Sequence, residues 1–265
     1  MSAKIHPTSI ISPKAEIGED VIIGPYCIIG ENVKIGKGTI LKNNVYIEKN
    51  TEIGEYNEFN MSGAIGIDPQ DKKYNKEETY LIIGNRNVFR EFVTISRGTI
   101  QDKGKTIIGN NNLFMAYVHI AHDCIVKDNT IIGNATNIAG HCIIGNNAII
   151  GGLTGVHQFT KIGDFAIIGG VSRVNKDIIP YCEAAGNPLR IIGINKVGLA
   201  RNNFSEEDKN CIKKAYKILF SSEYNVSQSV KKIKEEEELI KNKHIKILVE
   251  FIENSLRGIS KINKI

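Results

Sequence analysis

The sequence predicts a mainly β protein, a parallel β-helix followed by a C-terminal α-helical domain. An apolar residue returns at every sixth position without a gap from Ile5 to Ile65, and again from Ile108 to Val174. Glycine follows many of these residues, and the repeat stops beyond Pro180. Neither the 3.6-residue period of a helix nor the two-residue period of a strand persists over such lengths. Short strands joined by corners every six residues are typical of a parallel β-helix.

Three hexads close one coil of about 18 residues, and successive coils stack at about 4.8 Å, the spacing of neighbouring strands. Glycine after the apolar residue permits a corner where side chains would clash. Small or compact side chains lie two positions before the apolar residue, so we expect them to face inward too; they include Thr106, Cys124, Thr130, Thr136, Cys142, Ala148, Thr154, Thr160, Ala166 and Ser172. The five cysteines contain no metal-type pair, and we expect reduced packing residues.

Two polar interruptions, at about 66–82 and 97–106, leave the repeat and predict loops thrown out of the coil. The predicted β-helix domain spans 1–189 and the helical domain 190–265. Ser205-Glu206-Glu207-Asp208 has the form of a helix capping box. Further helices are predicted over about 230–241 and 244–257, from apolar residues on one face.

Composition excludes several classes of function. The chain has 265 residues, of which 34 are basic and 29 acidic, and no long basic run that would follow a nucleic-acid backbone. The N-terminus lacks an apolar signal core, and no hydrophobic stretch reaches membrane-spanning length. We therefore expect a cytoplasmic protein that does not bind nucleic acid and does not insert into a membrane. No cofactor is expected either.

Four histidines are predicted to share one edge of the coil. His122, His141 and His157 are 19 and 16 residues apart, close to one coil each, and His119 falls within three residues of the same edge. None occupies an apolar repeat position, so they do not fill the core. Stacked imidazoles could hold zinc, as in the carbonic anhydrases of this fold. Alternatively, one imidazole could take a proton from a sugar hydroxyl, with a carboxylate such as Asp123 fixing its tautomer.

His119-Ile120-Ala121-His122-Asp123-Cys124 resembles the active-site signature of the UDP-N-acetylglucosamine O-acyltransferases, the first enzymes of lipid A synthesis. The resemblance covers essentially the whole chain, including Pro69-Gln70-Asp71-Lys72-Lys73-Tyr74, Arg97-Gly98-Thr99, Ala139-Gly140-His141, Val156-His157-Gln158-Phe159, Gly193-Ile194-Asn195 and Gly198-Leu199-Ala200-Arg201. It implies a left-handed β-helix and a homotrimer with active sites between neighbouring coils. It also implies transfer of a 3-hydroxyacyl chain from acyl carrier protein to the 3-position of a UDP-linked amino sugar, without a metal.

The resemblance assigns a role to each matching residue. His122 would be the general base, Asp123 would orient it, and the Gly140 N–H would stabilise the oxyanion. The resemblance implies that eight residues contact the substrates: Asp71, Lys73, His119, His141, His157, Gln158, Asn195 and Arg201. Of these, Asn195 and Arg201 would hold the nucleotide end. Gly170 stands where the family limits acyl length. Basic residues that could meet the acidic carrier protein are Lys176, Arg190, Lys196 and Arg201.

Four residues depart from the family pattern: Ser96, Pro188, Val197 and Asn202. Ser96 and Pro188 replace histidines of well-known members, so N-acylation of the 3-amino analogue of the UDP-sugar remains an alternative to ester formation. A zinc hydratase on the same fold is a lower-ranked alternative. The N-acyltransferase that acts later in lipid A synthesis usually carries an extra N-terminal domain, whereas here the hexads begin at Ile5.

Overall fold

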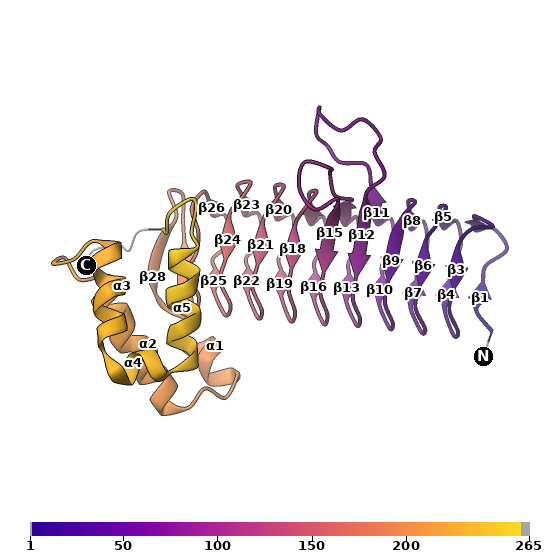
Figure 1. Ribbon diagram of the computed structural model, residues 1–265. Helices are drawn as coiled ribbons and strands as arrows, with labels where there is room; N and C mark the ends of the chain where they lie inside the picture. The colour runs from indigo at the N-terminus through magenta and orange to yellow at the C-terminus, as the bar shows by residue number, and fades with distance from the viewer. Residues whose placement is uncertain (1, 261–265) are drawn as a thin grey trace.

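The computed structural model describes residues 2–260 and contains a parallel β-helix capped by five short helices (Figure 1). Each strand of the coil pairs in parallel with the strand three places along the chain, so consecutive strands belong to three different sheets. Register offsets of 18 residues, such as Ile22 to Ile40 and Ile125 to Ile143, match the predicted coil length. The sheets therefore form the three faces of a triangular column.

The first sheet contains β1 (Lys4–Ile5), β4 (Ile22–Ile23), β7 (Ile40–Leu41), β10 (Glu58–Phe59), β13 (Val88–Phe89), β16 (Leu113–Phe114), β19 (Ile131–Ile132), β22 (Ile149–Ile150), β25 (Ile167–Ile168), β27 (Cys182–Ala185) and β28 (Arg190–Ile194). The second contains β2 (Ile10–Ile11), β5 (Ile28–Ile29), β8 (Tyr46–Ile47), β11 (Ala64–Ile67), β14 (Thr94–Ser96), β17 (His119–Ile120), β20 (Asn137–Ile138), β23 (Gly155–Val156) and β26 (Arg173–Val174). The third contains β3 (Glu16–Ile17), β6 (Lys34–Ile35), β9 (Thr51–Ile53), β12 (Tyr80–Ile83), β15 (Lys105–Ile108), β18 (Ile125–Val126), β21 (Ile143–Ile144) and β24 (Lys161–Ile162).

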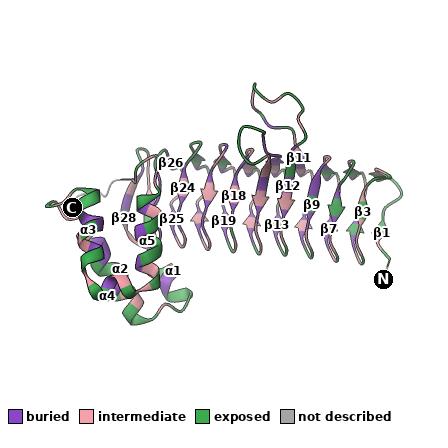
Figure 2. Cartoon of the chain, viewed as in Figure 1, coloured by how far each residue is buried: buried purple, intermediate pink, exposed green. Residues whose placement is uncertain are grey.

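The sixth-position residues fill the core as predicted. Every one from Ile23 to Val174 is buried, and the compact residues two positions earlier are buried beside them (Figure 2). Ile5 is exposed, and Ile11 and Ile17 are only half-buried, because they belong to the first coil and within residues 2–260 no coil stacks on its outer side. Glycine after the apolar residue serves close stacking: a Cβ on Gly24 would lie 2.2 Å from the Lys42 carbonyl oxygen of the next coil. All five cysteines are buried and unpaired.

A stack of three aromatic rings runs through this core. The Phe59, Phe89 and Phe114 rings are parallel, with centroids 4.5 and 4.8 Å apart, and all three are buried. Phe89, the middle ring, touches both neighbours.

We expect Phe89→Ala to lower the free energy of unfolding by about 3–5 kcal/mol, because it removes a buried ring and leaves a cavity between two others. Chemical denaturation followed by far-UV circular dichroism measures this loss. Phe92→Ala is the matched control, since Phe92 is 39% exposed at a corner, and it should cost about 0.5 kcal/mol. Equal losses in the two variants would contradict the importance of the stack.

Both interruptions form loops that leave the same edge of the column, between the second and third sheets. The first joins β11 to β12 and covers 68–79, and the second joins β14 to β15 and covers 97–104. Each loop is shorter than predicted, because flanking residues pair with the next coil: Ile67 pairs with Ser96, and Tyr80 with Lys105. Their positions on successive coils place them side by side, as Figure 1 shows beside β11 and β15.

The first helix, α1 (Lys196–Arg201), lies within the predicted helical domain but before the first helix that was predicted. It continues with α2 (Glu206–Leu219), α3 (Val226–Glu235), α4 (Glu237–Lys241) and α5 (Lys243–Glu253). The predicted start after Ser205 is confirmed, since the Ser205 hydroxyl accepts from the Asp208 N–H at 3.0 Å. The predicted helix over 230–241 is two helices, because the backbone of Glu236 is extended (ψ 102°). In residues 2–260, no helix combines the length and apolar character needed to cross a membrane.

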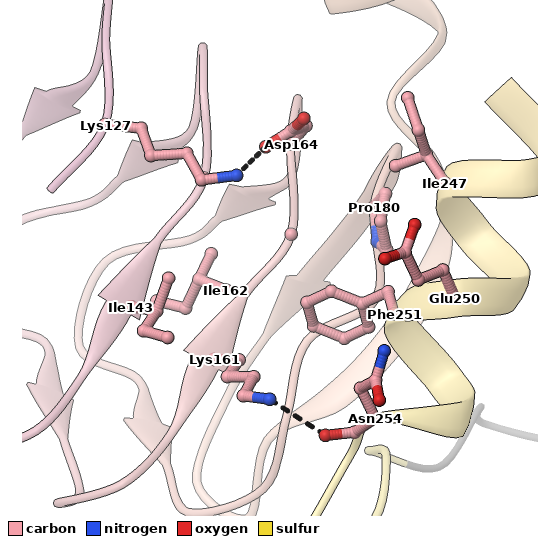
Figure 3. Close-up of a pocket in the computed structure, with 12 residues that line it drawn as sticks. Lys127, Ile143, Lys161, Ile162, Asp164, Pro180, Ile247, Glu250, Phe251 and Asn254 are labelled. Carbon is pink, nitrogen blue, oxygen red and sulfur yellow. Dashed lines mark hydrogen bonds and ion pairs between the residues drawn. The ribbon is translucent and has the colours of Figure 1, made fainter. Parts of the chain in front are cut away.

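The helices close the C-terminal end of the column. Figure 3 shows α5 beside the last strands of the third sheet, where the Lys161 ammonium donates to the Asn254 carbonyl oxygen at 2.8 Å. A pocket of about 310 Å³ lies in this junction, lined by Ile162, Pro180 and Phe251 among others. It is separate from the histidines. The strand β28 runs antiparallel to β27, so residues 190–194 extend the first sheet before the helices begin.

Candidate active site

The histidines lie at the same edge as the two loops, where the chain turns from the second sheet to the third. On three successive coils, the second residue after the buried apolar one is His122, then Gly140, then Gln158. The third residue is Asp123, then His141, then Phe159, and each has a left-handed backbone with φ near 60°. The 18-residue coil therefore stacks His122 against Gly140, and Asp123 beneath His141.

His122 and Asp123 form a close pair. The His122 Nδ1 lies 2.8 Å from an Asp123 carboxylate oxygen. Because a carboxylate only accepts hydrogen bonds, Nδ1 carries the proton and Nε2 keeps its lone pair. This is the tautomer required of an imidazole that acts as a general base through Nε2.

The Asp123 carboxylate is held from the second loop. It accepts from the Thr99 backbone N–H at 2.9 Å and from the Thr99 hydroxyl at 2.6 Å, while its own N–H donates to the Thr106 hydroxyl. Burial by itself raises the pKa of Asp123, but the hydrogen bonds from His122 and Thr99 outweigh it and lower that pKa below its usual value. Asp123 is therefore an ionised, immobilised partner for the imidazole.

Gly140 lies directly against the imidazole of His122. A Cβ at this position would be 2.7 Å from His122 Cε1 and 2.8 Å from Nε2. The Gly140 carbonyl oxygen accepts from the Phe159 N–H, whereas the Gly140 N–H has no acceptor among the described residues. Glycine thus provides both the room for the ring and an unused backbone donor beside Nε2.

His141 makes a second imidazole–carboxylate pair. Its Nδ1 lies 3.1 Å from a carboxylate oxygen of Asp102 in the second loop and 3.9 Å from Asp123. Its ring stacks on Phe159 at 4.4 Å and meets the His122 ring edge-on at 5.0 Å. One ligand atom each from His122, Asp123 and His141 lies within 4.8 Å of the other two, so these residues could also hold a metal ion.

His119 points outward from β17, one coil above Thr94, and its Nδ1 lies 2.7 Å from the Thr94 hydroxyl. Burial, with a smaller contribution from His122, lowers the pKa of His119. The ring is therefore neutral near pH 7. His157 is exposed, and its Nδ1 lies 3.2 Å from the Gln158 carbonyl oxygen.

Two adjoining cavities meet at His122. The first, of about 520 Å³, is lined by His119, His122, Gly140, Val156, His157 and Gln158 among others. The second, of about 810 Å³, is more polar and is lined by Asp71, Lys73, Asp102, His122, His141 and Gln158 among others. The structure thus gathers the predicted substrate-binding residues of the first loop and all four histidines around a single edge.

Three predicted residues lie elsewhere in the chain. Asn195 caps α1 through a bond from the Gly198 N–H at 2.8 Å and donates to the Phe165 carbonyl oxygen, so both the oxygen and the nitrogen of its amide are hydrogen-bonded. Arg201 is exposed at the end of α1, and Gly170 is exposed at a corner outside both cavities. Their roles toward the nucleotide and the acyl chain stay predictions.

Of the four residues that depart from the family pattern, Ser96 is buried, and its hydroxyl has no partner within residues 2–260.

The sequence predicted no role in the site for three residues that contact it: Thr99, Asp102 and Thr106. Thr99 and Asp102 lie in a loop outside the six-residue repeat, so their place relative to the histidines has no periodic signal. Thr106 was identified only as an inward-facing residue. The motif Arg97-Gly98-Thr99 pointed to the segment without indicating its contacts.

The column of six-residue repeats with its imidazole–carboxylate edge defines the class of hexapeptide-repeat transferases. The family model of the bacterial transferase hexapeptide repeat matches residues 26–60 and 105–140, and that of UDP-N-acetylglucosamine O-acyltransferase domain 2 matches residues 177–260. Curated relatives named acyl-(acyl-carrier-protein)–UDP-N-acetylglucosamine O-acyltransferase come from Thermodesulfovibrio yellowstonii (49% identity over 97% of this chain and 98% of the relative) and Syntrophobacter fumaroxidans (44% over 97% and 99%). The chain belongs to this UDP-N-acetylglucosamine O-acyltransferase family.

Solved structures agree with this assignment. The crystal structure of the UDP-N-acetylglucosamine O-acyltransferase from Moraxella catarrhalis is 44% identical, with a TM-score of 0.94 over 98% of this chain and 100% of that one. The corresponding enzyme from Bacteroides fragilis is 42% identical, with the same TM-score over 97% and 100%. The predicted left-handed β-helix with a helical C-terminal part is confirmed.

Proposed function

We propose that this enzyme transfers a 3-hydroxyacyl chain from acyl carrier protein to the 3-hydroxyl of UDP-N-acetylglucosamine, the first step of lipid A biosynthesis, and that it does so in the cytoplasm. The names of the relatives give the acyl carrier protein as donor, UDP-N-acetylglucosamine as acceptor and O-acylation as the reaction. The observation that carries the proposal for this chain is the His122–Asp123 pair packed against Gly140, whose N–H has no acceptor among the described residues. A base and an oxyanion donor side by side suit acyl transfer to a hydroxyl.

In this mechanism, His122 Nε2 takes the proton of the sugar 3-hydroxyl as the oxygen attacks the thioester carbonyl carbon. Asp123 stabilises the imidazolium that forms, because its carboxylate already accepts from Nδ1. The tetrahedral intermediate then collapses, the C–S bond breaks, and the imidazolium returns its proton to the leaving thiolate of the carrier. The products are the 3-O-acylated sugar and the free thiol, and no group of the enzyme becomes acylated.

The negative charge on the thioester oxygen is assigned to the Gly140 N–H. A backbone donor that is already oriented needs no rearrangement at the moment of reaction, and one such donor contributes roughly 10²–10³ in rate. In this arrangement, the substrate lies between Gly140 and the loop residues Asp71 and Lys73. His141 and Gln158 line the polar cavity beside them. His119 and His157 line the first cavity, to which we assign the acyl chain.

We further propose a homotrimer. A threefold ring uses a heterologous contact, in which two different surfaces of each subunit meet. The outer faces of two sheets offer rows of apolar side chains in register: Leu113, Ile131, Ile149 and Ile167 on the first sheet, and Ile82, Ile107, Ile125 and Ile143 on the third. All are half-buried in the single chain. Sedimentation at several protein concentrations tests this assembly.

The carrier protein is proposed to dock on the basic residues near the C-terminal end of the column. Lys176, Lys196 and Arg201 are exposed, and Arg190 is half-buried. An acidic partner would be steered there by charge, so its on-rate should fall with ionic strength.

The function is tested by offering UDP-N-acetylglucosamine and its 3-amino analogue, each with a series of 3-hydroxyacyl carrier proteins, and weighing the products. We expect the O-acylated sugar, with one preferred chain length. Exclusive use of the 3-amino acceptor would replace the ester with an amide. Stoichiometric zinc in the active purified protein, lost together with activity on chelation, would favour the hydratase alternative.

A further inference from the structure

Arg97 is the largest fully buried side chain that carries a charge in the described part of the chain. Its guanidinium donates to the Gly66 carbonyl oxygen, to the Asp68 carboxylate, and to the Tyr74 hydroxyl at 3.1 Å. A second carboxylate, that of Glu48, lies 3.5 Å away. Burial of an unpaired charge is very costly, so Arg97 can be buried only because these partners compensate its charge.

The partners of Arg97 belong to the first loop and its base. Gly66 lies in β11, the strand from which the loop departs. Asp68 is the first residue of the loop, and Tyr74 lies at its middle. The Tyr74 hydroxyl also donates to Asp68 at 3.2 Å, which closes a small network around the guanidinium. The Arg97 N–H bonds to the Ile67 carbonyl oxygen at 3.0 Å. Arg97 therefore ties the entry and the turn of this loop to the column.

The residues between these anchor points line the active site. Gln70 borders both cavities, and Asp71 and Lys73 border the polar one, next to His122 and His141. Asp68 and Tyr74 bracket them in sequence. Since the Arg97 guanidinium contacts both Asp68 and Tyr74, the position of the segment between them depends on Arg97.

The residues that follow Arg97 reach the catalytic pair, His122 and Asp123. Thr99, two residues after Arg97, donates two of the hydrogen bonds that hold the Asp123 carboxylate, and His122 supplies the third. Between them, the Gly98 N–H donates to the Tyr80 carbonyl oxygen at the exit of the first loop. Residues 97–99 thus connect the first loop with Asp123, the partner of the general base.

We propose that Arg97 is a positioning residue for the sugar-nucleotide acceptor, acting through Asp68 and Tyr74 on the loop that carries Gln70, Asp71 and Lys73. The inference rests on the proposed function, because it concerns how that acceptor is held. Arg97 itself touches neither substrate. Its role is to hold the loop at the distance from His122 at which the sugar hydroxyl meets Nε2, where small displacements have large effects.

The test separates the two substrates. Steady-state kinetics are measured for Arg97→Lys, Asp68→Asn and Tyr74→Phe, varying UDP-N-acetylglucosamine and the acyl carrier protein independently. We expect KM for UDP-N-acetylglucosamine to rise about tenfold or more in Arg97→Lys, because a lysine cannot bridge Gly66, Asp68 and Tyr74 together. KM for the acyl carrier protein should change less than twofold. Hydrogen exchange of the backbone over 68–79 should accelerate in the same variant.

Arg90→Lys is the matched control, since the Arg90 side chain is half-exposed and, within residues 2–260, pairs only with its neighbour Glu91. If Arg97→Lys fails to fold, Asp68→Asn and Tyr74→Phe still answer the question, because they change partly exposed loop residues and should raise the same KM. Unchanged acceptor KM in folded variants, or equal effects on both substrates, overturns the inference. Inactivity of the wild-type enzyme in the same assay overturns the proposed function instead.

Discussion

His122→Ala is expected to lower kcat for acyl transfer by about a hundredfold to ten-thousandfold, the contribution of a positioned general base. Removal of the ring takes away the Nε2 lone pair, and it leaves the Asp123 carboxylate with its two bonds from Thr99. The fold should survive, because His122 lies at a corner and not in the core. Single-turnover assays with saturating substrates, compared with the wild-type enzyme, measure the loss at the chemical step.

His6→Ala is a suitable control, because His6 is exposed at the N-terminal end of the column and, among the described residues, its side chain bonds only Thr8. It should leave kcat unchanged. Near-normal transfer by a folded His122→Ala enzyme would remove His122 from the role of base. His141 would then be the next candidate, since it has its own carboxylate partner in Asp102.

Gly140→Ala is expected to reduce kcat by about a hundredfold, although it adds only a methyl group. The new Cβ would stand 2.7 Å from His122 Cε1, so the imidazole must move away from its bond with Asp123. A displacement of about 1 Å in a catalytic group costs on the order of 10²-fold. The nearest atoms belong to a side chain and not to the backbone, so thermal stability should stay close to that of the wild type.

Gly193→Ala is the matched control, since a Cβ on Gly193 has no atom within 4 Å. It should retain both activity and stability. The His122 imidazole resonances, followed by nitrogen NMR, provide a second readout, because the bond from Nδ1 to Asp123 shifts the Nδ1 signal. A Gly140→Ala enzyme with full activity and an unchanged His122 spectrum would show that the ring does not need this space.

The repeat determined most of the fold. A six-residue period decides which side chains face inward, and the 18-residue coil converts sequence distance into stacking, so the core from Ile23 to Val174 could be predicted residue by residue. The same periodicity placed the histidines at one edge. The handedness came from resemblance alone, because the period is the same for either hand. The helix boundaries were less accurate, since α1 was missed and a break at Glu236 divides one predicted helix.

The sequence by itself thus determined a column with histidines along one edge, because that arrangement follows from a local and repeated pattern. Only the tertiary structure decided that His122 stacks on Gly140. It also decided that Thr99 holds Asp123 and that Asp102 pairs with His141. It alone revealed that the buried Arg97 anchors the neighbouring loop. Loop residues lie outside the period, and their positions are set by hydrogen bonds to segments 24 to 39 residues away. Such contacts have no counterpart in any local pattern of residues.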